Sequence, residues 1–415
     1  MKAVFYEIAP VGWVTCKWLR HLWRGCLLSR LNGFSLRDVP PPELPGDDWV
    51  RVRTLLGGIC GSDVALAVQK QPPDSILQAF TSMPFIFGHE NVAVVDQAGP
   101  AVDASWVGRR VCVEPTLGCT ARGIDPPCPR CAAGEFGACE KFADPAAGRY
   151  RIPPGTSIGY NARTGGSLGE FFVAHASQLV PVPDSLGDEE AVLTDPLACS
   201  LHAVLRADLA GAEQVLVYGA GMLGLGAIAA LRAVGFRGRI DALDRDPHLK
   251  DKALGLGASE FLVPPGDAGA RFDLIARRTG ATVQKARFNN YMLSGGYDVV
   301  FECVGGAASV EESLKWTRAR GQVVMIGTTG GRGVDLTPVW FRELHVLGAY
   351  GRQVETFAGR RIGTYQLVHE LMAAGKLPVR PLLTHTFRVE QFRQAFAVAM
   401  DKGRHAAVKV AIDFR

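Results

Sequence analysis

The sequence lacks any run of about 18 consecutive uncharged apolar residues, so we expect no membrane-spanning helix. Its first residues, MKAVFYEIAPVG, have no basic start, apolar core or small-residue cleavage site, and therefore do not resemble a secretory signal. The chain also lacks a large excess of charge of one sign, because 45 Lys and Arg residues against 41 Asp and Glu residues give a formal net charge of +4. A nucleic-acid-binding protein would carry a stronger and more local basic bias. We expect a cytoplasmic protein that binds no nucleic acid.

Internal repeats and low-complexity tracts are missing too, and the composition, with 47% hydrophobic and 21% charged residues, is typical of a folded globular chain. A length of 415 residues exceeds what one hydrophobic core usually organises, so two or three domains are expected. In a reducing cytosol, the ten cysteines are better explained as thiols or metal ligands than as disulfides.

The pattern of hydrophobic residues changes near Glu189. Before it, residues 40–185 consist of short β-rich segments broken by Gly, Pro and Asp, which predicts an irregular, barrel-like β domain. After it, apolar strands alternate with helices up to about Tyr350, which is typical of a parallel, doubly wound α/β sheet. The chain then closes with a helix around Tyr365 and a strand in AAVKVAIDF.

A glycine-rich turn lies between the apolar strand VLVY and the helix LGAIAALRAV: Gly219, Ala220, Gly221, Met222, Leu223, Gly224. In a dinucleotide-binding turn, the first glycine permits the sharp bend, the second admits a pyrophosphate and the third allows close strand–helix packing. The helix N-terminus then offers unpaired N–H donors to the phosphates. The sequence predicts a dinucleotide site; the alternative is an ordinary structural turn.

An acidic residue stands where such a site needs one. Asp244 ends the next strand, RIDALD, 20 residues after Gly224. A carboxylate there binds both ribose hydroxyls of NAD and repels the 2′-phosphate of NADP. We expect NAD, while the neighbouring Arg245 leaves NADP as an alternative.

Metal-ligand residues recur in the first half of the chain. Cys60 in CGSD, His89 and Glu90 in GHE, and Asp195 in TDPL supply a thiolate, an imidazole and carboxylates. Such a set suits a catalytic zinc with one open position. Their separation in sequence leaves open the alternative that Cys60 is a small buried hydrophobe and His89 a structural histidine.

A second cysteine group, Cys119-x8-Cys128-x2-Cys131-x7-Cys139, lies in a loop rich in Pro and Gly. Four thiolates satisfy tetrahedral zinc without leaving an open position, as in structural sites. The alternative, four reduced structural cysteines, fits poorly because the stretch is too polar to bury them all.

Together these motifs resemble the zinc-dependent medium-chain alcohol dehydrogenases, particularly the branch of polyol (sorbitol-like), threonine and glucose dehydrogenases. The resemblance extends over nearly the whole chain and includes GICGSD, GHE, the four-cysteine stretch, GAGMLG, DVVFECVG and VKVAID. It implies a GroES-like catalytic domain over residues 1–190 with a structural zinc lobe at about 112–145. A Rossmann NAD-binding domain over 191–348 and a C-terminal return over 349–415 would complete the fold.

The resemblance also implies an activity: a zinc-dependent oxidoreductase that transfers hydride between NAD and an alcohol, such as a polyol or a sugar. Cys60 and His89 match the catalytic zinc ligands, with Glu90 and Asp195 as further carboxylates at the metal. Ser62 matches the hydroxyl that takes the substrate proton, and the four clustered cysteines match the structural zinc site. Relatives of this kind form homodimers and homotetramers.

Four departures from the family pattern stand out. Ala65 replaces the histidine that usually ends the proton relay, so the proton needs another route, and Ala93 replaces the last glycine of GHExxG. Cys119 lies farther from Cys128 than is usual, which weakens its assignment as a ligand. Asp195 stands where the polyol branch has glutamate, and its shorter side chain suggests a contact with the metal through water.

Two other functions remain open. One is a zinc-free reductase of the same superfamily that acts on enones or quinones, which would not need Cys60, His89 and Asp195 together. The other is a non-catalytic dinucleotide-binding sensor or scaffold, supported by the missing relay histidine at Ala65. Two zinc ions per chain favour the dehydrogenase, and one favours either alternative.

Residues 12–32 form an insertion without a counterpart in the family. Helical periodicity predicts a basic amphipathic helix with Lys17, Arg20, His21 and Arg24 on one face, opposite an apolar face made of Trp18, Leu19, Leu22, Trp23, Cys26 and Leu27. We expect it to cover its own domain or to form a subunit contact, and membrane association is not expected. An anionic membrane surface and a cap over the substrate cleft are the alternatives.

Overall fold

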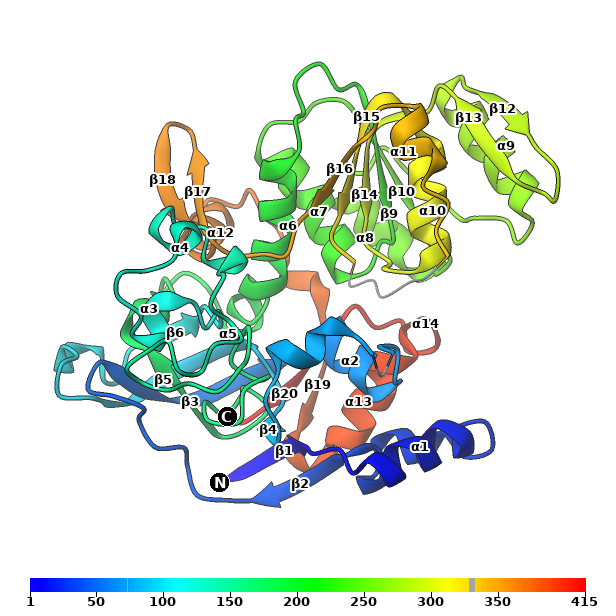
Figure 1. The fold of residues 1–415 in the computed structure, drawn as a ribbon. Helices are drawn as coiled ribbons and strands as arrows, with labels where there is room; N and C mark the ends of the chain where they lie inside the picture. The colour runs from blue at the N-terminus through cyan, green and yellow to red at the C-terminus, as the bar shows by residue number, and fades with distance from the viewer. Residues whose placement is uncertain (73, 328–332) are drawn as a thin grey trace. The chain divides into compact units, whose positions relative to one another are not determined.

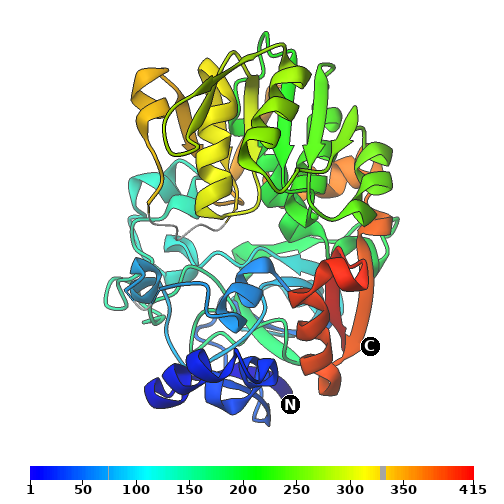
Figure 2. The same ribbon diagram turned by 90° about the vertical axis from the view of Figure 1, so that its right-hand side faces the viewer.

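The computed structural model describes residues 1–72, 74–327 and 333–415 and divides into two compact units (Figure 1, Figure 2). Unit 1 comprises Met1–Asp195, Arg352–Ala373 and Leu382–Arg415. Unit 2 comprises Pro196–Gly351 and Ala374–Pro381. Within the described ranges, no helix has the length and apolar character needed to cross a membrane.

Unit 1 is built on a seven-stranded sheet in the order β19-β20-β3-β5-β6-β8, with β7 paired to β3. These strands are β3 (Trp49–Gly58), β5 (Glu90–Ala98), β6 (Arg110–Val113), β7 (Phe171–His175), β8 (Leu179–Pro181), β19 (Leu383–Arg388) and β20 (Lys409–Asp413). All pairs are antiparallel except β19 with β20. Since β20 pairs with β3, the C-terminal strand completes the sheet that the N-terminal half begins, and the prediction of a β-rich domain is confirmed.

A smaller sheet in unit 1, β2-β1-β4, contains β1 (Lys2–Tyr6), β2 (Phe34–Asp38) and β4 (Phe85–Ile86). It packs through aromatic side chains, Tyr6, Phe34, Phe85 and Phe87, against α13. The helices of the unit are α1 (Pro10–Leu19), α2 (Gly61–Ala67), α3 (Cys119–Arg122), α4 (Pro129–Ala132), α5 (Asp188–Ala191), α12 (Thr364–Ala373), α13 (Phe392–Met400) and α14 (Lys402–His405). A hairpin of β17 (Val354–Phe357) and β18 (Arg360–Gly363) precedes α12.

Unit 2 contains a six-stranded parallel sheet in the order β11-β10-β9-β14-β15-β16. Its strands are β9 (Gln214–Tyr218), β10 (Arg239–Leu243), β11 (Glu260–Leu262), β14 (Tyr297–Glu302), β15 (Thr317–Met325) and β16 (His345–Gly348). Its helices include α7 (Met222–Ala233), α8 (Lys250–Gly255), α9 (Ala268–Thr279), α10 (Ala307–Trp316) and α11 (Thr337–Phe341), while α6 (Thr194–Arg206) leads into the unit. Numbered along the chain, the order is 3-2-1-4-5-6, that of the Rossmann fold, which confirms the predicted doubly wound sheet.

One element of unit 2 was not predicted. Between α9 and β14, the chain forms an antiparallel hairpin of β12 (Thr282–Lys285) and β13 (Tyr291–Ser294). Leu293 and Tyr291 pack against Phe272 of α9, which attaches the hairpin to the main core. The connecting residues Phe288 and Asn289 have positive φ angles, and Phe288 is 98% exposed.

The insertion differs from the single long helix that its periodicity predicts. The helix α1 ends at Leu19, and the backbone N–H groups of Leu22 and Trp23 both bond to the Leu19 carbonyl in a turn. A 3₁₀ helix, Arg24–Leu28, then brings Cys26 and Leu27 back against Cys16. The predicted apolar face is therefore wrong: its Cys26 and Leu27 are buried, whereas its Trp18, Leu22 and Trp23 are exposed.

Candidate functional site

Three of the predicted ligand residues meet in unit 1. The ligand atoms of Cys60, His89 and Glu90 all lie within 4.8 Å of one another. Cys60 is the residue that caps the N-terminus of α2, where its backbone N–H donates to Asp63 Oδ2 at 2.8 Å. Glu90 begins β5, and His89 directly precedes it. The start of α2 therefore positions Cys60, and the start of β5 positions His89 and Glu90.

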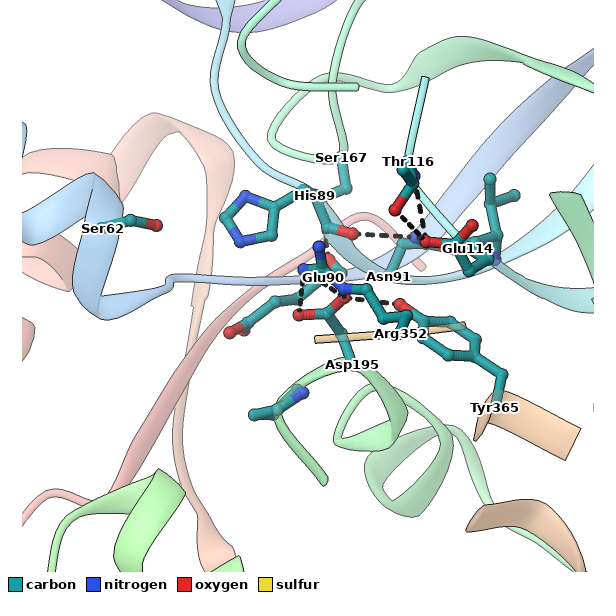
Figure 3. Close-up of polar contacts among 12 residues, drawn as sticks. Ser62, His89, Glu90, Asn91, Glu114, Thr116, Ser167, Asp195, Arg352 and Tyr365 are labelled. Atoms are coloured by element: carbon teal, nitrogen blue, oxygen red, sulfur yellow. Dashed lines mark hydrogen bonds and ion pairs between the residues drawn. The ribbon is translucent and has the colours of Figure 1, made fainter. Parts of the chain in front are cut away.

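Two glycines make room for this cluster. Gly58 of β3 pairs with Glu90, and a Cβ at Gly58 would lie 2.2 Å from Glu90 Oε2. Gly88 has a φ of +100°, a conformation that L side chains rarely adopt, and a Cβ there would also meet the Leu168 backbone at 2.6 Å. Asn91 donates to the His89 carbonyl at 3.1 Å and so holds the turn (Figure 3).

The electrostatics of the cluster suit a bound cation. Burial and the adjacent Glu90 raise the pKa of the Cys60 thiol to about 12, because a thiolate there would be desolvated beside a second negative charge. Among the described residues, the buried Nδ1 of His89 has no hydrogen-bond partner. Thiolate, imidazole and carboxylate are the ligands that zinc takes in proteins, and a divalent ion would reverse the penalty on the thiolate. The residues therefore fit a zinc ion.

Lys409 was not predicted to be part of this site. It begins β20, is 3% exposed, and forms an ion pair with Glu90. Its ammonium also donates to the Ile59 carbonyl at 3.1 Å. A buried lysine beside Glu90 balances the charge of a carboxylate that would otherwise be costly to bury.

Asp195 is not among the three residues whose ligand atoms all lie within 4.8 Å of one another. Arg352 donates to its two oxygens at 2.8 and 2.9 Å, and the Tyr365 hydroxyl donates at 2.5 Å (Figure 3). Burial raises the pKa of the Asp195 carboxyl, but Arg352 and His89 outweigh it and hold the pKa below its usual value. The chain first leaves unit 1 after Asp195 and first returns to it at Arg352, so the ion pair joins these two points of the chain.

Ser62 has a partner that the sequence did not indicate. The Tyr160 hydroxyl lies 2.7 Å from Ser62 Oγ and 3.0 Å from Asp63 Oδ1. Asp63 is fully buried, and burial raises the pKa of its carboxyl. Ala65 is buried on the same helix, so the position of the usual relay histidine holds no polar group. The Tyr160 hydroxyl instead links Ser62 and Asp63 through hydrogen bonds.

The four cysteines of the second group also converge. Cys119, Cys128, Cys131 and Cys139 present ligand sulfurs within 4.8 Å of one another, with Cys119 Sγ 3.7 Å from Cys139 Sγ. The hydrogen bond from Cys131 lowers the pKa of Cys139 to about 5. Backbone N–H groups point at the sulfurs, as from Cys128 to Cys119 Sγ at 3.3 Å. The geometry suits a closed four-thiolate zinc site and brings Cys119 to it despite its distant position in sequence.

In unit 2, the glycine turn joins β9 to α7. Gly219 has a φ of +95°, and a Cβ at Gly224 would lie 1.9 Å from the Gly219 carbonyl oxygen, so neither position admits a side chain. Apart from its neighbours along the chain, a Cβ at Gly221 would meet no atom of the described residues within 4 Å. Open space in front of a helix N-terminus fits a pyrophosphate at this turn.

Asp244 follows β10 and lies beside this turn. Its Oδ2 accepts the Ala220 N–H at 2.7 Å, and its Oδ1 accepts the Asp246 N–H at 3.0 Å. Each oxygen keeps a lone pair for a ribose hydroxyl. Arg245 is exposed, Met222 is buried, and Leu223 is half-buried at the start of α7.

Comparison with family models supports this assignment. Residues 46–184 match the model of the alcohol dehydrogenase GroES-like domain, and residues 223–363 match the model of the zinc-binding dehydrogenases. The first match contains both cysteine-bearing sites, and the second begins within the glycine turn.

Curated relatives and solved structures agree with the models. The chain is 30% identical to sorbitol dehydrogenase of Arabidopsis thaliana over 87% of this chain and 88% of that protein. It is 30% identical to L-threonine 3-dehydrogenase of Rhizobium etli over 92% and 95%. The structure of 2R,3R-butanediol dehydrogenase from Bacillus subtilis shares the fold, with a TM-score of 0.70, 22% identity and coverage of 100% and 99%. The chain belongs to the zinc-dependent medium-chain alcohol dehydrogenases, a family of NAD(P)-dependent oxidoreductases.

Proposed function

We propose that the protein oxidises a secondary alcohol of a small polyhydroxylated molecule, a polyol or sugar, with NAD as the hydride acceptor, or catalyses the reverse reduction. The observation that carries this proposal is the cluster of Cys60, His89 and Glu90 in unit 1, together with the hydrogen bond between the side chains of Cys60 and Ser62. The names of the relatives, which include sorbitol, threonine and L-idonate dehydrogenases, support a hydroxylated substrate.

Cys60, His89 and Glu90 would hold the zinc ion, which when bound acts as a Lewis acid and lowers the pKa of an alcohol. NAD, held at the turn of Gly219, Gly221 and Gly224, supplies the hydride acceptor when bound. Lys409 neutralises Glu90, so that this carboxylate need not stay on a metal to remain buried. Asp195, fixed by Arg352, would reach the metal through water.

Ser62 accepts the substrate proton in this proposal. The Tyr160 hydroxyl positions the Ser62 hydroxyl and offers a path for the proton toward the buried Asp63 carboxyl, which replaces the route lost at Ala65. Tyr160 acts through Ser62 and is a positioning residue.

Variants of Ser62 and Tyr160 test this path. Ser62→Ala should lower kcat by roughly 10²- to 10⁴-fold, the usual contribution of a group that transfers a proton in the reaction. Tyr160→Phe removes one hydroxyl and should lower kcat about tenfold with KM little changed, because it leaves Ser62 present but poorly oriented. The double variant should be no slower than Ser62→Ala alone, since both act on one proton transfer. Steady-state kinetics would contradict the path if the two effects multiplied.

The preference for NAD over NADP rests on Asp244. Asp244→Asn keeps an oxygen acceptor for the turn but loses the charge, so the affinity for NAD should fall about tenfold or more, as for hydrogen bonds to a charged group. The ratio of the KM values for NADP and NAD should fall with it, because the repulsion of the 2′-phosphate is lost. Asp246→Asn, at the neighbouring carboxylate, is the control. An unchanged ratio in Asp244→Asn would show that the ribose lies elsewhere.

We also infer a cytoplasmic homo-oligomer. Both cysteine clusters need reduced thiols to bind metal, which supports a reducing compartment. The edge strand β16 follows the exposed aromatic residues Trp340 and Phe341 of α11. Among the described strands, β16 forms the edge of the sheet, and this edge together with the exposed aromatic rings that precede it supports a homodimer contact in unit 2, with a homotetramer as the larger form.

The substrate class is tested by nicotinamide absorbance at 340 nm in solution, with zinc-replete protein and a panel of polyols, aldoses, simple alcohols and threonine, each with NAD and NADP. Turnover of polyols or sugars with NAD is the expected result. Turnover of enones or quinones alone would favour the zinc-free reductase instead. No turnover by protein that holds both zinc ions would favour the non-catalytic sensor.

A further inference from the structure

The insertion leaves an apolar face uncovered. Val11, Val14, Trp18 and Leu22 follow one another at intervals of three or four residues, and so lie along one side of α1 and the turn after it. They are 81%, 50%, 78% and 90% exposed, and Trp23 beside them is 54% exposed. We call these five residues the outer face of the insertion. Exposed apolar residues that occur singly need no explanation, but a contiguous row with two tryptophans indicates a binding surface.

The opposite side of the insertion anchors it to unit 1. Cys16, Cys26 and Leu27 are buried and pack with Leu19 and with Met400 of α13, a helix that Figure 1 shows near α1. The Asn32 amide donates to the Leu27 and Ala67 carbonyls at 2.8 Å each, and Arg393 of α13 donates to the Leu28 carbonyl at 3.0 Å. Because the backbone is fixed from within, the exposed tryptophans are presented by an ordered scaffold and not by a free tail.

The insertion and its flanking residues carry formal charge of one sign only. No Asp or Glu occurs from Ile8 through Arg37, whereas Lys17, Arg24 and Arg30 are exposed. The neighbouring helix α13 also contains no acidic residue. Lys17 lies over the Trp13 ring, with its ammonium 5.1 Å from the ring centroid, so its charge stays close to α1.

We propose that the outer face of the insertion docks the protein on an anionic lipid surface. Apolar side chains with tryptophan on one side and Lys and Arg around them are the features of helices that lie in the membrane interface. Anionic headgroups attract such a cationic border. A second copy of the chain fits less well, because a symmetric contact through this face would bring its cations against the same cations of the partner.

Vesicle co-sedimentation of the full-length, zinc-loaded protein tests this. Wild-type protein should sediment with vesicles of phosphatidylcholine and phosphatidylglycerol in equal parts, but not with phosphatidylcholine alone, and high salt should release it. Trp18→Ser/Leu22→Ser and Lys17→Glu/Arg24→Glu should each reduce the bound fraction by at least about tenfold in partition coefficient. Phe288→Ser/Val107→Ser is the matched control, because it removes one exposed aromatic and one exposed aliphatic residue outside the insertion. It should bind vesicles as the wild type does.

All variants should keep wild-type turnover, which shows that they are folded. Equal binding to neutral and anionic vesicles, or unchanged binding by Trp18→Ser/Leu22→Ser, would overturn the proposal. So would the absence of any vesicle binding by the wild type. In that case sedimentation velocity identifies the alternative: if the wild type self-associates and Trp18→Ser/Leu22→Ser does not, the outer face is a contact between copies of this chain.

Discussion

Cys60→Ala should abolish turnover while it leaves cofactor binding intact. Activation of the alcohol at a metal is worth several kcal/mol, so its loss should lower kcat/KM by about 10³-fold or more. The zinc content should fall from two ions per chain to one, since the second cysteine cluster is untouched. NAD binding should persist, because the glycine turn and Asp244 belong to unit 2. Metal analysis, steady-state kinetics and fluorescence titration with NADH measure the three quantities.

The matched control is Cys112→Ala. Cys112 is a fully buried thiol of the same unit that bonds to the Ala191 carbonyl at 3.3 Å and lies outside both cysteine clusters. It should keep both zinc ions and most of the activity, so any loss specific to Cys60→Ala comes from the metal and not from a cavity. A Cys60→Ala protein that retains two zinc ions and wild-type turnover would exclude the proposed ligand set. A wild-type protein with one zinc would favour the reductase or the sensor.

Much of the fold could be predicted from the sequence because its signals are local. The buried strand β9 is a continuous apolar run, as expected for a parallel strand covered on both faces, and the glycines after it fix the turn. The hairpin of β12 and β13 gave no such signal, since its strands are only four residues long and mostly exposed or half-buried. The insertion departs from its predicted structure for another reason. Periodicity shows which residues share a helix face, but not where the helix ends or which face is covered.

The candidate site was predictable only in part, for a related reason. Motifs such as CGSD and GHE indicate candidate ligand residues, but not the residues that contact them in the folded protein. Three contacts of the site join residues that are far apart in sequence. Lys409 pairs with Glu90 across 319 residues, Arg352 with Asp195 across 157, and Tyr160 with Ser62 across 98. No local sequence pattern marks these pairs. Arg352 illustrates the consequence. The sequence places Asp195 at the metal, whereas the structure gives both of its oxygens to a guanidinium.

The second large effect is expected at the four-cysteine lobe, with Cys119→Ser. The apolar residues around the sulfurs are few, chiefly Phe142, with Phe80 and Ile124 partly buried, so the lobe has little core of its own. Structural zinc contributes about 10 kcal/mol or more to the folding of small domains that depend on it. In this larger unit, we expect a loss of at least about 4 kcal/mol, seen as an earlier unfolding transition and as rapid proteolysis within residues 119–139.

Cys119→Ser also decides the assignment that the sequence left weakest. The long spacing between Cys119 and Cys128 argues against Cys119 as a ligand. In the structure, however, the Cys119 sulfur lies among the sulfurs of the other three cysteines and accepts the Cys128 N–H. If Cys119 is a ligand, the variant should lose one zinc ion and keep the other, with residual turnover in the protein that remains folded. Cys112→Ser is the control, since it changes a buried thiol of the same unit in the same way. If Cys119→Ser keeps its full zinc content and its resistance to proteolysis, only the other three cysteines bind this zinc. A fourth ligand would then have to come from another residue or from water.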